Sequence, residues 1–119
     1  IYFAGFKENA LDYMVASDIY ISTSLGEALG YSIIESQMIG LPVIASNVLG
    51  HNEIIIDGIN GLLFDLGNIE QAKTQILELS EDESKAKKLA ENGRIKFEKN
   101  FTLETMITSI KEIYSKILK

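Results

Sequence analysis

Short apolar runs alternate with helical patterns along residues 1–67. The spacing of apolar residues predicts helices over residues 9–16 and 31–39, and Gly40 is the residue at which the second of them is expected to stop. Four runs rich in apolar, β-branched or aromatic residues predict strands over residues 1–4, 19–23, 41–45 and 62–64. Strands separated by single helices favour right-handed crossovers and a parallel sheet. The pattern therefore predicts an α/β fold with a doubly wound, Rossmann-like parallel sheet.

The remainder of the chain carries three amphipathic helical patterns that close the fold. Asn68 is the predicted N-cap of the first helix and Thr102 that of the third, while Ser80 with Glu83 predicts a capping box for the second. A short helical turn is expected over residues 52–56. The third helix has an apolar stripe broad enough to pack against something beyond this chain, formed by Leu103, Met106, Ile107, Ile110, Tyr114 and Ile117.

Length and composition limit the architecture to a single domain. The chain has 119 residues, of which 46% are hydrophobic, and no run approaches the ~18 apolar residues that a membrane-spanning helix needs. It has no cysteine, which excludes disulfides, thiolate metal sites and cysteine nucleophiles. The chain does not begin with Met, so we expect a piece of a longer protein. A cytoplasmic location fits this composition, with the inner face of the membrane as an alternative.

The charge is distributed unevenly along the chain. The formal net charge is −6, but residues 1–68 hold one basic residue, Lys7, against eight acidic ones. Residues 69–119 hold ten basic and nine acidic residues. Nucleic-acid binding is not expected, because it needs a clustered basic surface. The basic run over residues 85–99 is interleaved with glutamates and is expected to be a solvated helix face, with peripheral membrane contact as the minor alternative.

Residues 24–35 are the stretch in which we expect ligand chemistry. They follow the carboxyl end of a predicted strand, contain two glycines, and run into a helix N-terminus. Ligands of open parallel sheets bind outside the carboxyl ends of the strands. The first N–H groups of a helix point outward without a partner, and the helix dipole adds partial positive charge there. This place can therefore accept a phosphate although the surrounding segment is almost free of basic side chains.

Glu27 and Glu35 add a second feature to the same stretch. Carboxylates beside an anion site would repel a phosphate that they touched. They fit a ligand whose hydroxyl groups lie at its ends and whose phosphates lie between, as in a nucleotide sugar with its ribose diol, pyrophosphate and sugar polyol. The alternative for both residues is a solvated carboxylate that interacts favourably with the helix dipole.

Several motifs of this chain resemble one known family. Ser24…Glu27-x-x-Gly30-x-x-x-x-Glu35, followed by Gly40-x-Pro42-Val43-Ile44-Ala45-Ser46, is similar to the Glu-x(7)-Glu region of retaining glycosyltransferases of family 4, in the GT-B class. Three further segments fit the same family pattern in the same order: Phe3-x-Gly5, Ala16-x-Asp18 and Gly50-x-x-Glu53-Ile54-Ile55-x-Asp57-Gly58-x-x-Gly61-Leu62-Leu63. The resemblance extends from residue 1 to about residue 67.

The resemblance implies that residues 1–119 are a partial, C-terminal donor-binding domain of a GT-B enzyme. The acceptor-binding N-terminal domain and the first strands of this domain would then be absent. Such an enzyme transfers a hexosyl-type sugar from a nucleotide diphosphate sugar, such as a UDP- or GDP-sugar, to a glycan or lipid-linked acceptor in polysaccharide biosynthesis. It retains the anomeric configuration and needs no bound metal or other cofactor. We expect the fragment alone to be inactive.

The same resemblance implies roles for individual residues. Glu27 would lie by the hydroxyls of the donor sugar and is the one catalytic candidate. The loop backbone of Gly26, Ala28 and Leu29 would also bind the donor. Glu35 would accept hydrogen bonds from the ribose, and Gly5 with Phe6 would lie near the base. The backbone N–H groups that face the diphosphate would be those of Gly30, Tyr31, Ser32 and Ile33.

The sequence departs from the family pattern at three points. Ala28 stands where glycine is usual after the first Glu, and Ser36-Gln37 stands where alanine and methionine are common, a change expected to have little consequence. The basic pair that neutralises the donor phosphates in the family belongs to an earlier segment and is absent here.

Other interpretations remain open at this stage. A non-catalytic α/β protein-interaction domain with a vestigial ligand crevice is the main alternative. A dinucleotide dehydrogenase is disfavoured, because no Gly-x-Gly-x-x-Gly follows the first strand. Glu53 is either a helix cap or a ligand contact, and His51, the only histidine, is expected to be an exposed loop residue without a metal site.

Overall fold

The computed structural model describes residues 1–118 and is built on a three-stranded parallel sheet. The strands are β1 (Tyr20–Ser22), β2 (Val43–Ser46) and β3 (Leu62–Phe64), in the order β1-β2-β3. Tyr20 lies opposite Val43, and Ile44 lies opposite Leu62. Every residue of the central strand is buried, as expected for a parallel strand covered on both faces. The predicted parallel sheet is therefore confirmed.

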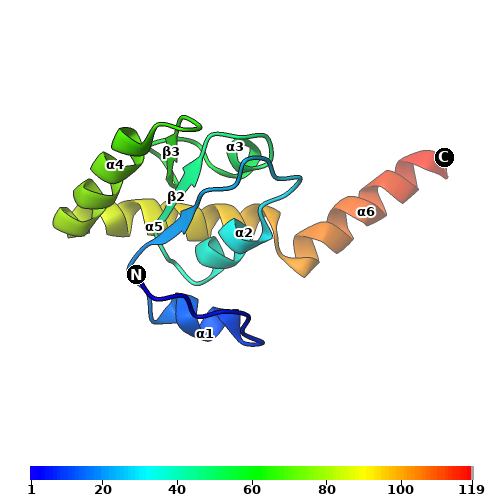
Figure 1. The fold of residues 1–119 in the computed structure, drawn as a ribbon. Coiled ribbons are helices and arrows are strands. Elements are labelled where there is room, and N and C mark those ends of the chain that lie inside the picture. The colour runs from blue at the N-terminus through cyan, green and yellow to red at the C-terminus, as the bar shows by residue number, and fades with distance from the viewer. Residues whose placement is uncertain (119) are drawn as a thin grey trace.

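Six helices complete the described chain (Figure 1). The short helix α1 precedes the sheet, α2 and α3 connect its strands, and α4, α5 and α6 follow it. Their bounds are α1 (Ala10–Val15), α2 (Tyr31–Met38), α3 (His51–Ile54), α4 (Ile69–Glu81), α5 (Glu83–Asn100) and α6 (Leu103–Ile117). The three closing helices agree with the sequence prediction.

Helices cover both faces of the sheet, which agrees with the predicted Rossmann-like α/β class. Successive side chains of a strand point to opposite faces, and β2 accordingly contributes Val43 and Ala45 to one core cluster and Ile44 to the other. The first cluster contains Ile33 of α2 and Ile54 of α3. The second cluster is completed from β3, α4 and α5 by Leu62, Phe64, Leu79 and Leu89. The two crossover helices, α2 and α3, therefore lie on the same face of the sheet. This is expected, because right-handed crossovers stay on one face when each new strand is added at the same edge.

Gly40 ends α2 as predicted. Its φ is +72°, which a residue with a side chain rarely adopts. The Gly40 N–H donates to the carbonyl of Gln37 (3.1 Å), and the Leu41 N–H donates to the carbonyl of Ser36 (2.9 Å). This pair of bonds is a Schellman motif, and it turns the chain directly into β2.

The caps of the closing helices agree with the prediction at two of three places. The N-caps Asn68 and Thr102 accept hydrogen bonds from the N–H groups of Gln71 and Thr105. The capping box at Ser80 is wrong, because α4 continues to Glu81 and the Ser80 hydroxyl donates to the carbonyl of Leu77 within that helix.

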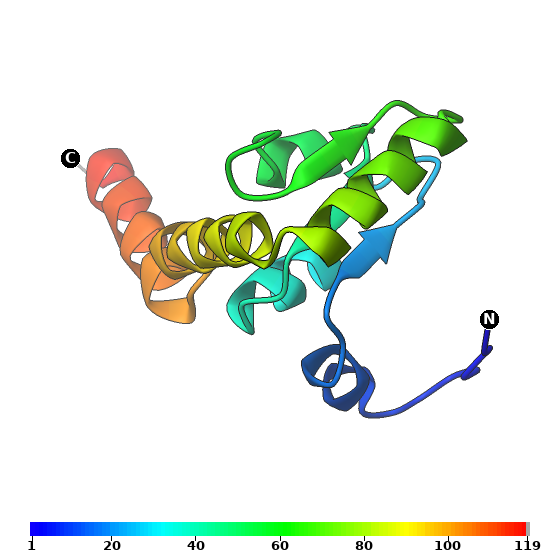
Figure 2. The same ribbon diagram turned by 90° about the vertical axis from the view of Figure 1, so that its left-hand side faces the viewer.

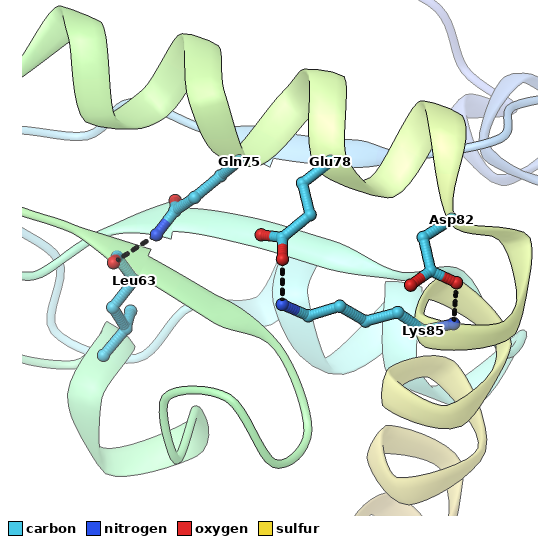
Figure 3. Close-up of polar contacts among 5 residues, drawn as sticks. All are labelled: Leu63, Gln75, Glu78, Asp82 and Lys85. Atoms are coloured by element: carbon cyan, nitrogen blue, oxygen red, sulfur yellow. Dashed lines mark hydrogen bonds and ion pairs between the residues drawn. The ribbon is translucent and has the colours of Figure 1, made fainter.

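Asp82 is the cap that sequence reasoning missed, and it stands between α4 and α5. Its carboxylate accepts from the N–H of Lys85 (2.9 Å), while the Lys85 ammonium pairs with Glu78 on α4 (Figure 3). On the same helix, the Gln75 amide donates to the carbonyl of Leu63 in β3 (2.8 Å). The bonds of Lys85 thus fix the corner between α4 and α5, and the Gln75 bond ties α4 to β3.

The predicted strand over residues 1–4 does not form. A strand exists only where a neighbouring strand supplies backbone hydrogen bonds, and no described strand pairs with this segment. Its side chains are exposed, except for the half-buried Ala4. Helix α1 likewise buries no residue, and it lies apart from the sheet in both views (Figures 1 and 2).

Helix α6 extends away from the body of the molecule (Figure 1). It buries no residue, and its apolar stripe is open to solvent over its whole length, with Ile110 43% and Ile117 72% exposed. The expectation that this stripe packs against something beyond the chain stays a prediction. Within residues 1–118, no helix combines the length and the apolar character needed to cross a membrane.

The neighbours Ser36 and Gln37 are both buried in α2, but their side chains differ in hydrogen bonding. The Ser36 hydroxyl donates to the carbonyl of Ser32 (2.7 Å). The side-chain amide of Gln37 has no hydrogen-bond partner at either end among the described residues. Gln37 packs against α5 where Gly93 has no side chain, since a Cβ there would lie 3.1 Å from the Gln37 Cγ. The structure therefore adds a feature at Gln37 that the sequence did not indicate, a buried amide without a partner, and little consequence stays a prediction.

We expect Gln37→Met to stabilise the chain by about 1–2 kcal/mol, because methionine has nearly the same shape and removes an unpaired buried amide. Urea unfolding followed by circular dichroism measures the change. Gln71→Met is the matched control: Gln71 accepts from the N–H of Asp65 (2.8 Å), so its loss should destabilise. A lower stability of Gln37→Met would mean that the amide is hydrogen-bonded.

Candidate functional site

The loop over residues 23–30 leaves the carboxyl end of β1 and enters α2. This is the edge of the sheet at which open α/β folds bind ligands. Gly26 and Ala28 are exposed, whereas Glu27 and Leu29 are half-buried. The Glu27 carboxylate accepts from the N–H of Ala28 (3.2 Å), so it is held beside the loop backbone.

The four backbone N–H groups predicted to face a diphosphate divide into two pairs. The Tyr31 N–H donates to the carbonyl of Leu29 (2.8 Å), and the Ile33 N–H donates to the carbonyl of Gly30 (3.0 Å). The N–H groups of Gly30 and Ser32 have no acceptor among the residues that the structure describes. The Ser32 hydroxyl accepts from the hydroxyl of Tyr20 (2.7 Å), which ties this helix start to β1. Among the four, Gly30 and Ser32 are therefore the two whose N–H groups have no acceptor within the described residues; Gly30 is buried and Ser32 is half-buried.

Tyr31 and Ile33 contribute differently to the same turn. The Tyr31 side chain is 71% exposed, while the Ile33 side chain is fully buried in the core. Ile33 thus anchors the start of α2 to the sheet, and its backbone is already engaged in the turn.

His51 is buried, which corrects the expectation of an exposed loop histidine: only 1% of its surface is accessible. Its Nδ1 lies 2.9 Å from the carbonyl oxygen of Ser46, and its Nε2 lies 3.4 Å from the hydroxyl of Ser22. Because a carbonyl only accepts, Nδ1 carries a proton and donates to Ser46. Both serines end strands, Ser22 in β1 and Ser46 in β2. The histidine thus spans the carboxyl ends of two neighbouring strands.

Sequence reasoning assigned no role in the site to these three residues, although one signal pointed to them. Polar residues that end consecutive strands of a parallel sheet come to lie at the same edge. Ser22 and Ser46 occupy such positions, and the lone histidine follows the second strand by five residues.

Backbone contacts lock the loop over residues 23–30 onto the segment that precedes α3. Gly50 has φ +90°, and a Cβ built on it would overlap the carbonyl oxygen of Glu27 and lie 2.9 Å from its carbonyl carbon. A Cβ on Gly30 would lie 3.3 Å from Cδ2 of His51. Two glycines at these positions therefore let the two loops touch.

Glu35 and Phe6 lie around the first turn of α1. Glu35 is half-buried and lines a hollow of about 370 Å³ with residues 8–12. Phe6, 92% exposed, lines an adjoining hollow of about 570 Å³ that shares Glu8, Asn9 and Asp12 with the first. Gly5 precedes Phe6 with φ +68°. The structure thus brings the predicted ribose residue and the predicted base residues to neighbouring places.

The lining of the two hollows is acidic. Glu8, Asp12 and Glu35 contribute carboxylates, and Lys7 contributes the one ammonium. The Lys7 ammonium lies 5.8 Å from the centre of the Tyr13 ring, within the range of a cation–π contact. Such a lining favours ligand hydroxyls and N–H groups and repels phosphates. Among residues 1–118, no group of three or more His, Asp or Glu side chains is arranged to hold a metal ion.

Glu53 is exposed on α3, and its carbonyl accepts from the Lys96 ammonium (3.3 Å). Burial lowers the pKa of Lys96 from its ordinary value.

The basic run over residues 85–99 is a largely solvated helix face, as predicted. The exposed ion pair between Glu83 and Lys87 on α5 is typical of it.

Comparison with known families and sequences finds one consistent relationship. Residues 1–96 match the model of the glycosyl transferases of group 1. The uncharacterised glycosyltransferase MJ1178 of Methanocaldococcus jannaschii is 34% identical over 110 residues, covering 92% of this chain and 31% of that protein. The UDP-Gal:α-D-GlcNAc-diphosphoundecaprenol α-1,3-galactosyltransferase of Escherichia coli is 27% identical over 110 residues, covering 92% and 28%. The chain spans about a third of the length of these relatives.

Solved structures agree with the sequence relationship. Anabaena Alr3699/HepE in complex with UDP superimposes with a TM-score of 0.87 at 31% identity, covering 96% of this chain and 32% of that one. The complex of the same protein with UDP-glucose superimposes with a TM-score of 0.85 at 29% identity and the same coverage. The predicted fold, a Rossmann-like domain of a GT-B glycosyltransferase, is thereby confirmed.

We expect Gly50→Ala to displace the loop over residues 23–30 and to destabilise the chain, because the added methyl group overlaps the Glu27 carbonyl. Gly58→Ala is the matched control, since Gly58 also has positive φ (+71°) but open space around it. The control should lose only the ~1–2 kcal/mol of backbone strain, and Gly50→Ala should lose more. Chemical denaturation measures both, and equal losses would contradict the proposed contact.

Proposed function

The chain belongs to the glycosyl transferases of group 1, and on this premise we propose that it is the part of such an enzyme that binds the nucleotide-sugar donor. The observation that carries the proposal is the superposition on a relative that is itself bound to UDP, over 96% of this chain. We propose a uridine diphosphate sugar as the donor, transferred by a retaining, hexosyl-type reaction without a bound metal.

The start of α2 is the proposed diphosphate site. Helix α2 is eight residues long, and the free N–H groups of Gly30 and Ser32 stand at its positive end. Backbone donors of this kind accept a phosphate without a basic side chain, which suits a segment whose single basic residue among residues 1–68 is Lys7.

The acidic hollows suit the uncharged parts of the donor. Glu35 accepts from the ribose hydroxyls, and Phe6 lies by the base in the adjoining hollow, with Gly5 directly before it. Glu27, half-buried between the exposed Gly26 and Ala28, accepts from the hydroxyls of the donor sugar. The repulsion between these carboxylates and the diphosphate then aligns the ligand, with its charged centre at the helix and its hydroxyl ends at the acids.

Catalysis in this scheme comes from stabilising the charge of the departing diphosphate and from orienting the sugar. The acceptor is a glycan or a lipid-linked sugar, as the name of the Escherichia coli relative illustrates. An acceptor-binding N-terminal domain, outside the 119 residues, completes the cleft at the cytoplasmic side of the membrane. This chain alone is inactive in the scheme, because part of the cleft is supplied from elsewhere.

The proposal predicts that UDP shifts the amide NMR signals of Gly5–Phe6 and Gly30–Glu35 in the free chain. GDP, ADP and CMP should give smaller shifts. Glu35→Ala should weaken UDP binding about tenfold, the loss of a charged hydrogen bond. The control Glu70→Ala removes an exposed carboxylate of α4 and should bind normally. A silent titration with all four nucleotides would favour the alternative, a non-catalytic interaction domain with a vestigial crevice.

A second prediction concerns Glu27 in the full-length enzyme. If its carboxylate stabilises the transition state, Glu27→Ala should lower kcat by about a hundredfold or more and should change KM for the donor only slightly. Steady-state kinetics with a varied donor concentration measures both constants. An increase in KM with unchanged kcat would instead assign Glu27 to uniform binding.

A further inference from the structure

We propose that His51 is a positioning residue, which holds the loop over residues 23–30 in the shape that receives the donor diphosphate. The inference rests on the proposed function for its ligand, but the arrangement of the loop itself is independent of any ligand. The argument uses its burial, its two polar partners and the points at which its segment touches the loop.

The first step is a chain of hydrogen bonds that runs from His51 to the beginning of the loop. The Nδ1–H of His51 donates to the carbonyl of Ser46 (2.9 Å). The hydroxyl of the same serine donates to the carbonyl of Ser24 (2.6 Å). The histidine and the Val48 N–H (2.9 Å) thus both hold the carbonyl of Ser46, and the hydroxyl of the same serine holds the loop at Ser24.

The second step is that the same segment touches the loop at two further points. The backbone of Gly50 packs on the carbonyl of Glu27, and the ring of His51 packs beside the α-carbon of Gly30. Residues 46–51 thus contact the loop at its beginning, its middle and its end. A loop held at three points has little freedom to change the direction of the Gly30 and Ser32 N–H groups.

The third step is that an apolar side chain could fill the place of His51 but could not replace its bonds. Ser46 is fully buried and Ser22 is 8% exposed, so neither has free access to water. An aliphatic residue at position 51 would remove the ring donor from the Ser46 carbonyl, which would keep only the Val48 N–H (2.9 Å). It would also remove the ring nitrogen from the Ser22 hydroxyl, whose other neighbour is the Ser24 hydroxyl at 3.5 Å. The loop would then relax to find other partners, and the diphosphate site would lose its preorganisation.

The test compares His51→Leu with His51→Asn. Leucine fills the space without a donor, whereas the asparagine Nδ2 replaces the Nδ1–H donor to Ser46. Ser46→Ala removes the last link to Ser24 and tests the same path if His51→Leu does not fold. Thr74→Ala is the control, because it removes a hydroxyl that donates to a carbonyl (Glu70, 2.8 Å) on the far helix α4.

Two quantities are measured on each folded variant: the amide NMR shifts of residues 24–32 without ligand, and the Kd for UDP. We expect His51→Leu and Ser46→Ala to shift the loop amides and to weaken UDP binding about tenfold. His51→Asn should keep the wild-type loop shifts and bind within about threefold of wild type. A purely structural role would lower the unfolding midpoint without this rescue pattern.

Three results would overturn the proposal: wild-type loop shifts in folded His51→Leu, unchanged UDP affinity in that variant, or equal losses in His51→Asn and His51→Leu. Failure of the proposed function is recognised separately. If wild-type protein does not bind UDP while the ligand-free loop shifts still follow the histidine, the role in shaping the loop stands and the role in nucleotide binding is lost.

Discussion

The contact between two loops at the carboxyl edge of the sheet is the constraint on which the candidate site depends. One loop leads from β1 into α2, and the other leads from β2 into α3. They touch through backbone, since Gly50 allows the carbonyl of Glu27 to approach where a side chain would overlap it. The sheet register brings the strand ends together, and His51 fills the space beneath them. The direction of the first N–H groups of α2 therefore follows from how neighbouring strands end.

This arrangement separates the two charge requirements of a nucleotide sugar. A phosphate needs positive potential, and the helix start supplies it through unpaired N–H groups rather than through lysine. Hydroxyl groups need acceptors, and the hollows beside α1 supply carboxylates from Glu8, Asp12 and Glu35. Because the positive potential comes from backbone, the acidic front half of the chain is compatible with an anionic ligand. Charge composition alone would have argued against it.

Particular elements show which predictions sequence patterns can support. The strands at Val43–Ser46 and Leu62–Phe64, the stop at Gly40, and the caps Asn68 and Thr102 were predictable, because periodicity, glycine φ and capping are local effects. The end of α4 was placed wrongly because Ser80 and Asp82 are both good caps, and packing on the sheet carries the helix past the first. Residues 1–4 have a strand-like composition, but the partner that a strand needs is a tertiary feature.

The same division holds for the site. The sequence by itself determined that a glycine-containing loop with Glu27 and Glu35 follows a strand and enters a helix, since each of these features is a matter of residue type and spacing. Only the tertiary structure decided that Gly30 and Ser32 keep free N–H groups, that Glu35 faces the start of α1, and that His51 is buried beneath the loop. The physical reason is that hydrogen bonds and burial depend on which strand ends become neighbours, and residues 22, 24, 46 and 51 meet only after the parallel sheet has formed.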